Sequence, residues 1–349
     1  MALHNVAISK ITNTKKIKRT TQTGSVHIQM KVTWGLVGNS HDASVAVFHD
    51  TELVWASLAK DFTKVPNEPD LSSEQRIYAI EKYGWPNSVV WYERPLLKTL
   101  RQWRAGQGFL LKENDIKQYL FSWGIRRVPI AYTQHHHSHA AYAYYTQPHD
   151  DCAVVCIDSI GEFETLTVWH GKNGELHKIY SQGYPHSLGL FYSAMTQRVG
   201  LVPQRDEYMI SDWAQKGDPK KFYNLIALEL IEIAFPKITL KENLHRGCKW
   251  WRPELNSEQD LYDIAAATQR IFENSVDMLS RWAKFKTNSN HLALAGGGAM
   301  NRVAVNLIRP QWGSVWVPPN PGDSGSCIGA VLAKTKTFTN VDNAWYKVV

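Results

Sequence analysis

Cysteine and long apolar runs are scarce in this chain, and each scarcity excludes a class of protein. Only 4 of the 349 residues are cysteines, and Cys152 and Cys156 share one apolar run, which fits reduced core thiols better than a disulfide framework or a zinc knuckle. No apolar run reaches the roughly 18–20 residues that cross a bilayer. The N-terminus lacks the apolar segment of a signal peptide. We therefore expect a cytoplasmic, reduced protein without a membrane partner.

Acidic residues are absent from residues 1–31, which carry six of the basic ones. These six side chains give the segment a charge of +6, so that only +1 of the net charge of +7 is left for the rest of the chain. We expect a flexible basic arm. Basic arms bind phosphates, although some are solvated tails without a partner. The candidate contacts to nucleic acid, with DNA as the expected partner, are Lys15, Lys16, Lys18 and Arg19.

The bulk of the chain has the composition of a folded protein. Hydrophobic residues make up 44% and charged residues 20%, which is enough to bury a sizeable core. The length exceeds that of a usual single domain and predicts two lobes.

One order of segments occurs twice. An apolar strand, a small polar loop, a returning strand, a turn and a third strand follow one another over residues 32–55 and again over 152–180. This repeat predicts an α/β protein with two duplicated lobes around a central cleft, over residues 32–150 and 151–349. The loops that follow the two first strands are expected to face one another.

Between these segments the pattern favours helices. Helical composition extends over 73–82, 96–103 and 114–123, and amphipathic stretches cover 222–235 and 261–282. The pair Trp250-Trp251 predicts a loop that is exposed or faces the cleft, where the two rings would stack on a base; a packed corner is the alternative.

Two histidines four residues apart are the strongest chemical signal. His135 and His139 lie in a run of histidine, alanine and tyrosine that favours or tolerates a helix. Residues i and i+4 share one helix face, so both imidazoles can bind one ion. Asp323, in a loop of small residues, is the candidate oxygen ligand. Such a set suits Fe2+ or Zn2+; a surface run of histidines is the alternative.

A glycine run late in the chain predicts an anion site. The apolar strand 291–295 leads into Gly296, Gly297 and Gly298, and a helix follows over 303–308. Glycines before a helix leave backbone N–H groups free to bind phosphate. The run matches neither a Walker A loop nor a dinucleotide fingerprint. A turn that merely saves space is the alternative.

Six motifs in this order resemble the O-carbamoyltransferases that modify nodulation factors and antibiotics. The resemblance covers residues 33–335, and the family's N-terminal domain is an actin-like ATPase (RNase H-like) domain, akin to the tRNA threonylcarbamoyl-adenosine transferase. The motifs that carry it are residues 41–44, 135–140, 158–165, 186–192, 296–301 and 321–325.

The resemblance implies a reaction and a set of roles. A carbamoyl group moves from carbamoyl phosphate or carbamoyl-adenylate, with ATP, to an acceptor hydroxyl. His135, His139 and Asp323 would bind the metal. His41 is our candidate general base, since imidazole titrates near neutral pH, and Asp42 would orient it. The residues expected to bind the nucleotide, the carbamoyl group or phosphate are Asp158, Gly161, Glu162, Thr165, Ser187, Gly296, Gly297, Gly298 and Asn301.

The chain departs from the family pattern at several positions. Ser159 and Asp212 replace glycines, Met209 replaces a lysine, and the stretch 60–66 lacks a catalytic-site lysine for which Lys64 is the nearest substitute. Family members also carry a C-terminal domain that makes carbamoyl-adenylate. This chain ends about where that domain would begin, so a separate carbamoyl-adenylate-forming protein is the expected partner; a cleft that uses the carbamoyl donor differently is the alternative. A non-catalytic nucleotide-binding subunit is one alternative. An ATPase or sugar kinase is another, but it leaves the histidine pair unexplained.

The basic arm is the only clue to the acceptor. It favours a polyanionic acceptor, such as a hydroxymethylated base in DNA or a nucleotide. A base in a duplex would have to be flipped out of the stack. The alternative acceptor is a sugar-like small molecule.

Overall fold

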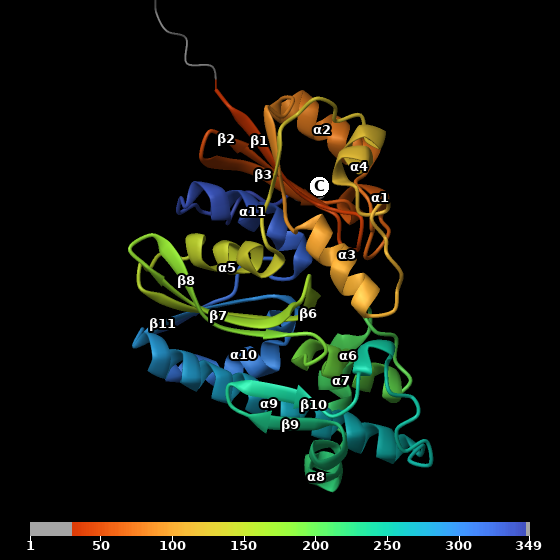
Figure 1. Ribbon diagram of the computed structural model, residues 1–349. Coiled ribbons are helices and arrows are strands. Elements are labelled where there is room, and N and C mark those ends of the chain that lie inside the picture. Colours follow the sequence, from red (N-terminus) through yellow and green to blue (C-terminus); the bar gives the residue numbers. More distant parts are fainter. Residues whose placement is uncertain (1–29, 347–349) are drawn as a thin grey trace, which may run out of the picture. The chain divides into compact units, whose positions relative to one another are not determined.

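The computed structural model describes residues 30–346 (Figure 1). The candidate nucleic-acid contacts Lys15, Lys16, Lys18 and Arg19 lie outside the described residues. Two five-stranded sheets, a two-stranded sheet and the helices around them make up the described part.

The first sheet is built around β1 (Val32–Val37). Its strand order is β3-β2-β1-β4-β5, and β1 pairs antiparallel with β2 and parallel with β4. Every residue of β1 is buried, as expected for a strand covered on both faces. The other strands are β2 (Ser44–His49), β3 (Glu52–Leu58), β4 (Ser88–Trp91) and β5 (Ile130–Tyr132).

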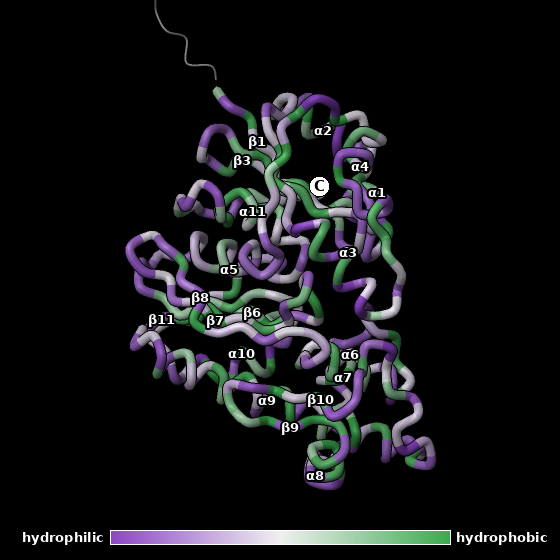
Figure 2. The backbone as a smooth tube through the Cα atoms, in the orientation of Figure 1, coloured by the Kyte–Doolittle hydropathy of each residue, from purple (hydrophilic) through white to green (hydrophobic). Residues whose placement is uncertain are grey.

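The second sheet repeats this topology around β6 (Cys152–Gly161). Its order is β12-β11-β6-β7-β8, and β6 pairs antiparallel with β7 and parallel with β11. In Figure 2 apolar colouring follows β6 and β7. The two predicted meanders are thereby confirmed. The other strands are β7 (Glu164–Lys172), β8 (Glu175–Gly183), β11 (His291–Ala295) and β12 (Ser314–Trp316).

Two helices in equivalent positions join the sheets. Helix α5 (His135–Tyr145) follows β5, and α11 (Ser326–Thr335) follows β12. They pack against each other between the sheets, α11 on β1 and α5 on β6 (Figure 1). Gly329 permits this approach, because a Cβ there would lie 1.9 Å from the Ser138 carbonyl oxygen. The chain then returns to the first sheet, where Trp345 bridges to Ala56.

The remaining elements flank the two sheets, and some of them pack on other helices rather than on a sheet. They are α1 (Lys60–Thr63), α2 (Ser73–Tyr83), α3 (Pro95–Arg104), α4 (Ile116–Ser122), α6 (Leu188–Arg198), α7 (Glu207–Ala214), α8 (Pro219–Glu229), α9 (Glu258–Thr287), α10 (Arg302–Ile308) and the hairpin of β9 (Ile231–Ala234) and β10 (Lys237–Leu240). None of the helices in the described part is long and apolar enough to cross a membrane.

Two local predictions were wrong. The helix expected over 222–235 ends at Glu229, because the alternating residues of β9 pair with β10 instead. Trp250 is 57% exposed as expected, but Trp251 is 3% exposed and its indole donates to Glu229 Oε2. Trp251 is therefore part of the second core and offers no stacking face.

Candidate metal centre

Four side chains from separate elements converge on one buried point. One nitrogen each of His135 and His139 and one oxygen each of Asp158 and Asp323 all lie within 4.8 Å of one another. The two Nε2 atoms are 3.1 Å apart. Asp323 Oδ1 lies 3.3 Å from each of them, and Asp158 Oδ2 lies 3.3 Å from that of His135.

The fold explains this convergence. Helix α5 begins at His135, so its first turn places the i and i+4 imidazoles on one face. Asp323 opens the short 3-10 turn Asp323–Gly325 that leads into α11. Because α5 and α11 pack side by side, the start of α5 and the turn before α11 bring the imidazoles and the carboxylate together. Asp158, the seventh residue of β6, completes the group.

The structure adds Asp158 to the expected set of metal ligands. The family resemblance implied a place for this residue in the nucleotide or carbamoyl pocket. Its position directly after the apolar run of β6 was the signal that could have found it. Two imidazole nitrogens and two carboxylate oxygens form a donor set that fits Fe2+ or Zn2+.

Electrostatics keeps the Asp158 carboxylate ionised, as a metal ligand must be, but it favours the protonated form of His135. Burial and the Asp323 carboxylate oppose ionisation of Asp158, but the histidines hold its pKa at about 2. Burial lowers the pKa of His135, whereas Asp323 and Asp158 together raise it well above its usual value. Binding of a cation must therefore displace a proton from this histidine.

The neighbours of the group fix the imidazoles. His139 Nδ1 lies 3.3 Å from Ser326 Oγ. A Cβ on Gly161 would lie 2.1 Å from His135 Cδ2, so only glycine leaves room for that ring. Within residues 30–346, His135 Nδ1 is buried without a hydrogen-bond partner. His136 instead contacts Thr167 Oγ1 at 3.0 Å.

His41 lies at the accessible side of the group. The β1–β2 loop places its Nδ1 3.0 Å from Asp42 Oδ2 and its Nε2 3.5 Å from Asp323 Oδ2. Its side chain is 37% exposed, whereas that of Asp323 is 8% exposed. Burial lowers the pKa of His41, but the carboxylates of Asp323, Asp42 and Asp158 outweigh it and raise that pKa to about 9.

A buried ion pair that was not predicted from the sequence supports the β1–β2 loop that carries His41. Lys98 Nζ lies 2.7 Å from Glu93 Oε1, and both side chains are buried. The same ammonium donates to the carbonyl oxygen of Asn39 at 3.2 Å. Asn39 and Asp42, on either side of His41, are left-handed, with φ of 57° and 52°. Such strain persists only where neighbours fix the backbone, and it is common at active sites. The sequence signal was the charged residue after the apolar strand β4.

Glu162 connects the turn after β6 to the first lobe. Its Oε1 accepts a hydrogen bond of 2.5 Å from the Arg94 backbone N–H, at the start of α3. Burial raises the pKa of this carboxyl to about 7. The Glu162 side chain is buried, and His135 is one of the groups that influence its pKa.

Other predicted pocket residues make internal hydrogen bonds. Thr165 Oγ1 donates to the His186 carbonyl oxygen at 2.6 Å. Ser187 Oγ donates to the Asp158 carbonyl oxygen at 3.1 Å and accepts from the Leu190 N–H that begins α6. The Thr165 hydroxyl thus holds the backbone at His186, and the Ser187 hydroxyl holds it at Asp158. Contact of either residue with a nucleotide stays a prediction.

The glycine run lies beside the same carboxylate. Gly297 N–H donates to Asp158 Oδ1 at 3.4 Å, and Gly296 N–H donates to the Pro321 carbonyl oxygen at 2.8 Å. A 3-10 turn over Gly297–Met300 contains Gly298, and Asn301 then caps α10 through the Ala304 N–H. Phosphate binding by this run stays a prediction.

Lys64, the nearest substitute for the missing family lysine, is exposed. Its ammonium donates to the Asp61 carbonyl oxygen at 2.6 Å. It is not part of the group around His135.

The fold and the buried group define the class of protein. Two lobes, each built on a five-stranded sheet of the same strand order, enclose a cluster of histidine and aspartate near the start of their joining helices. Residues 92–332 match the sequence model described as Carbamoyltransferase N-terminus, and the chain belongs to this family.

Individual relatives agree with this assignment. The chain is 28% identical over 346 residues to an uncharacterized protein of Synechocystis sp., a match that covers 86% of this chain and 56% of that protein. It is 28% identical over 205 residues to nodulation protein NolO of Bradyrhizobium diazoefficiens, covering 57% of this chain and 37% of that protein. The chain thus spans about half the length of the first relative, and less of the second.

Among solved structures, HypF of T. kodakarensis is similar in fold. The TM-score is 0.54 at 12% identity, and the match covers 88% of this chain and 48% of that one. At this identity the likeness concerns the fold alone.

Proposed function

We propose that this chain is a metal-dependent O-carbamoyltransferase whose acceptor is a hydroxymethylated base in DNA or a nucleotide. The donor is carbamoyl phosphate or carbamoyl-adenylate, with ATP as the linked nucleotide. The observation that carries the proposal is the placement of His41 beside the buried group of His135, His139, Asp158 and Asp323.

The buried group is the proposed site for Fe2+ or Zn2+. A cation bound there would act as a Lewis acid on the donor carbonyl or neutralise phosphate charge. The protein's own contribution is to keep both carboxylates ionised and both Nε2 atoms directed at one point.

His41 is the proposed general base. The acceptor oxygen forms a bond to the carbamoyl carbon, the bond from that carbon to the phosphate oxygen breaks, and the acceptor proton passes to His41 Nε2. Asp42 holds Nδ1 and so directs Nε2 toward the reaction. With its pKa near 9, His41 is protonated at neutral pH in the metal-free protein. We therefore expect it to act as a base only when the carboxylates hold a cation.

The donor is proposed to lie along the turn after β6 and the glycine run. Gly161, Glu162, Thr165 and Ser187 would surround the nucleotide or carbamoyl group. The glycine run of Gly296, Gly297 and Gly298, with Asn301, would lie against phosphate or ribose. A separate carbamoyl-adenylate-forming protein is the proposed partner, and the four buried free cysteines are compatible with a cytoplasmic setting.

The basic arm is the reason to propose DNA. Removing residues 1–29 takes away Lys15, Lys16, Lys18 and Arg19 among its cations. Each lost phosphate contact should reduce the slope of log affinity against log salt concentration by about 0.9. If the shortened chain binds DNA with an unchanged salt slope, the arm makes no phosphate contact and is only a solvated tail.

The test is transfer by the purified chain. It is incubated with carbamoyl phosphate, ATP and Fe2+, and separately with carbamoyl-adenylate. Acceptors are DNA containing hydroxymethylcytosine or hydroxymethyluracil and a panel of sugars. Mass spectrometry measures the gain of a carbamoyl group, with His135→Ala and His41→Ala in parallel. A gain on DNA that both substitutions abolish supports the proposal. A gain on sugars alone overturns the acceptor, and ATP and metal binding without transfer to any acceptor indicates a non-catalytic subunit.

A further inference from the structure

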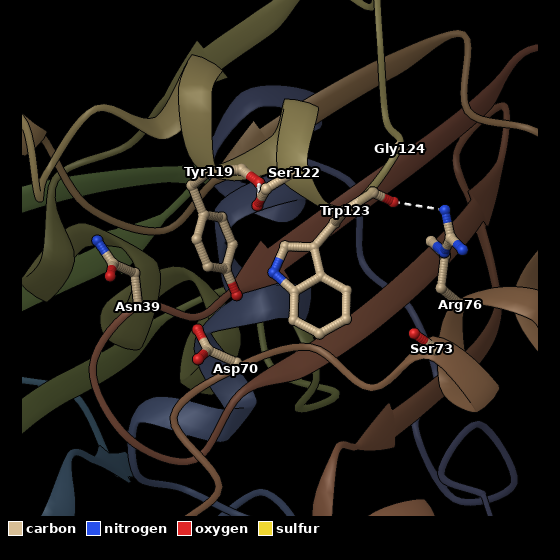
Figure 3. Close-up of a pocket in the computed structure, with 8 residues that line it drawn as sticks. All are labelled: Asn39, Asp70, Ser73, Arg76, Tyr119, Ser122, Trp123 and Gly124. Atoms are coloured by element: carbon tan, nitrogen blue, oxygen red, sulfur yellow. Dashed lines mark hydrogen bonds between the residues drawn. The ribbon is translucent and has the colours of Figure 1, made fainter.

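A cavity separate from the buried metal group opens in the first lobe. It has a volume of about 540 Å³, within the range of pockets for small ligands. It lies between the start of α2 and the end of α4, and Figure 3 shows its lining side chains. They are Asn39, Asp70, Ser73, Arg76, Tyr119, Ser122, Trp123 and Gly124.

One wall of this cavity is the loop that carries His41. Asn39 belongs to both, and the Tyr119 hydroxyl packs so closely on Gly38 that a Cβ there would lie 2.6 Å from it. The same hydroxyl accepts from the Leu71 N–H at 3.2 Å and interacts with the Asn39 backbone and with Asp70. The Cα atoms of Asn39 and His41 are at most about 7 Å apart. The cavity and His41 therefore share one short loop.

The lining combines an aromatic ring with one side chain that accepts hydrogen bonds and one that donates them. In Figure 3 the Trp123 indole stands in the middle of the cavity, with Asp70 on one side and Arg76 on another. Asp70 can only accept and Arg76 can only donate. Arg76 donates from one terminal nitrogen to the Trp123 carbonyl oxygen, which fixes the guanidinium at the cavity wall.

This combination matches the base of a cytosine nucleotide. The exocyclic amine of cytosine donates, as a carboxylate requires, and its C2 carbonyl oxygen and N3 accept. The flat ring offers a face for an indole, which is how proteins bind bases taken out of a duplex. Uracil has a carbonyl in place of the amine and would set one acceptor against Asp70.

We propose that this cavity receives the base of the acceptor, a hydroxymethylated cytosine stacked on Trp123 with its amine toward Asp70 and its C2 carbonyl oxygen toward Arg76. The hydroxymethyl group would then extend past Asn39 toward His41. This inference rests on the proposed function, since it names the base and the place where it binds.

The test measures binding, not transfer, so that it can succeed or fail independently of the proposed activity. Isothermal titration calorimetry on the full chain uses three probes: 5-hydroxymethyl-dCMP, 5-hydroxymethyl-dUMP and methyl glucoside. We expect the cytosine nucleotide to bind at least about fivefold more tightly than the uracil nucleotide, and the glucoside not to bind.

Two variants and one control locate the ligand. Trp123→Ala should weaken binding about tenfold, as expected for loss of a stacking face. Asp70→Asn, which changes little in shape, should remove the preference for cytosine over uracil even if Trp123→Ala fails to fold. Trp103→Ala removes a tryptophan that is 64% exposed on α3 and should leave binding unchanged.

The outcomes are distinct. Equal binding of the nucleotide by wild type, Trp123→Ala and Asp70→Asn, or no binding by wild type, overturns the inference. Binding of the glucoside but of neither nucleotide also overturns it. Binding with the expected pattern but without carbamoyl transfer keeps this site and overturns the proposed function.

Discussion

The two lobes share one strand order but leave their central strands differently. After β1 the chain forms an open loop with two left-handed residues, and that loop presents the half-exposed His41. After β6 it forms a tight turn in which Gly161 pairs with Glu164, and the strand end presents the buried Asp158. The same frame thus supplies an accessible imidazole from one lobe and a buried carboxylate from the other.

The helices that join the sheets differ in the same way. The first turn of α5 contributes the imidazoles of His135 and His139, whereas the turn before α11 contributes the carboxylate of Asp323. The repeated fold therefore brings two pairs of equivalent chain positions together, and side-chain chemistry then divides the roles among them. The following predictions break or sharpen that division, from the largest expected effect to the smallest.

Removing a ligand from either helix should abolish metal binding. His135→Ala and Asp323→Ala each delete one of the four donors, and we expect the affinity for Fe2+ or Zn2+ to fall by more than about 100-fold, beyond the usual effect of altering an outer-shell partner. Metal analysis after dialysis measures this. His137 lies on the same helix but stacks on Trp169, so His137→Ala should retain the metal. Full metal content in Asp323→Ala would contradict the shared site.

Removing His41 should separate catalysis from metal binding. His41→Ala should lower kcat for carbamoyl transfer by about 10²- to 10⁴-fold, the usual contribution of a general base. Metal content should stay at the wild-type level, because His41 is outside the group of four donors. Steady-state kinetics and metal analysis on the same preparation test both. An unchanged kcat would assign proton transfer to another group.

Breaking the buried pair in the first lobe should destabilise the protein. Lys98→Met leaves Glu93 buried without its cation, which costs about 3–5 kcal/mol of unfolding free energy. Urea unfolding measures it. The double variant Glu93→Gln with Lys98→Met should recover much of that loss. Lys221→Met is the matched control. It also removes a lysine from a buried carboxylate, that of Asp263, but the Lys221 ammonium is exposed. Equal losses of unfolding free energy in Lys98→Met and Lys221→Met would show that burial of the pair has no special effect.

The smallest effect concerns pH and the metal-free protein. The folded pKa of His41 is about 9 and its ordinary value is 6.5, so its protonated form stabilises the fold fully below pH 6.5. That contribution is lost as pH rises from 6.5 through 9. The unfolding free energy of the chelator-treated chain should therefore decline over this window, and His41→Gln should make the decline shallower. Equal slopes in wild type and variant would contradict the electrostatic account.

Much of the fold was readable in the sequence. The repeated meanders predicted β1–β3 and β6–β8, because apolar alternation and turn residues act locally. The family assignment was also predicted from motif order, and the matched residues confirm it. Local pattern failed at Trp251 and at β9, where pairing and packing with distant residues decided the outcome.

The candidate site divides along the same line. The spacing of His135 and His139 follows from helix geometry alone, and a sequence can therefore predict it. The inclusion of Asp158, the bracing of Asn39 by Lys98 and the cavity around Trp123 depend on which strands and helices meet. Those meetings join residues far apart along the chain. Only the packing of α5 on α11 and of both on the two sheets decides them, because burial selects contacts by shape and not by order in sequence.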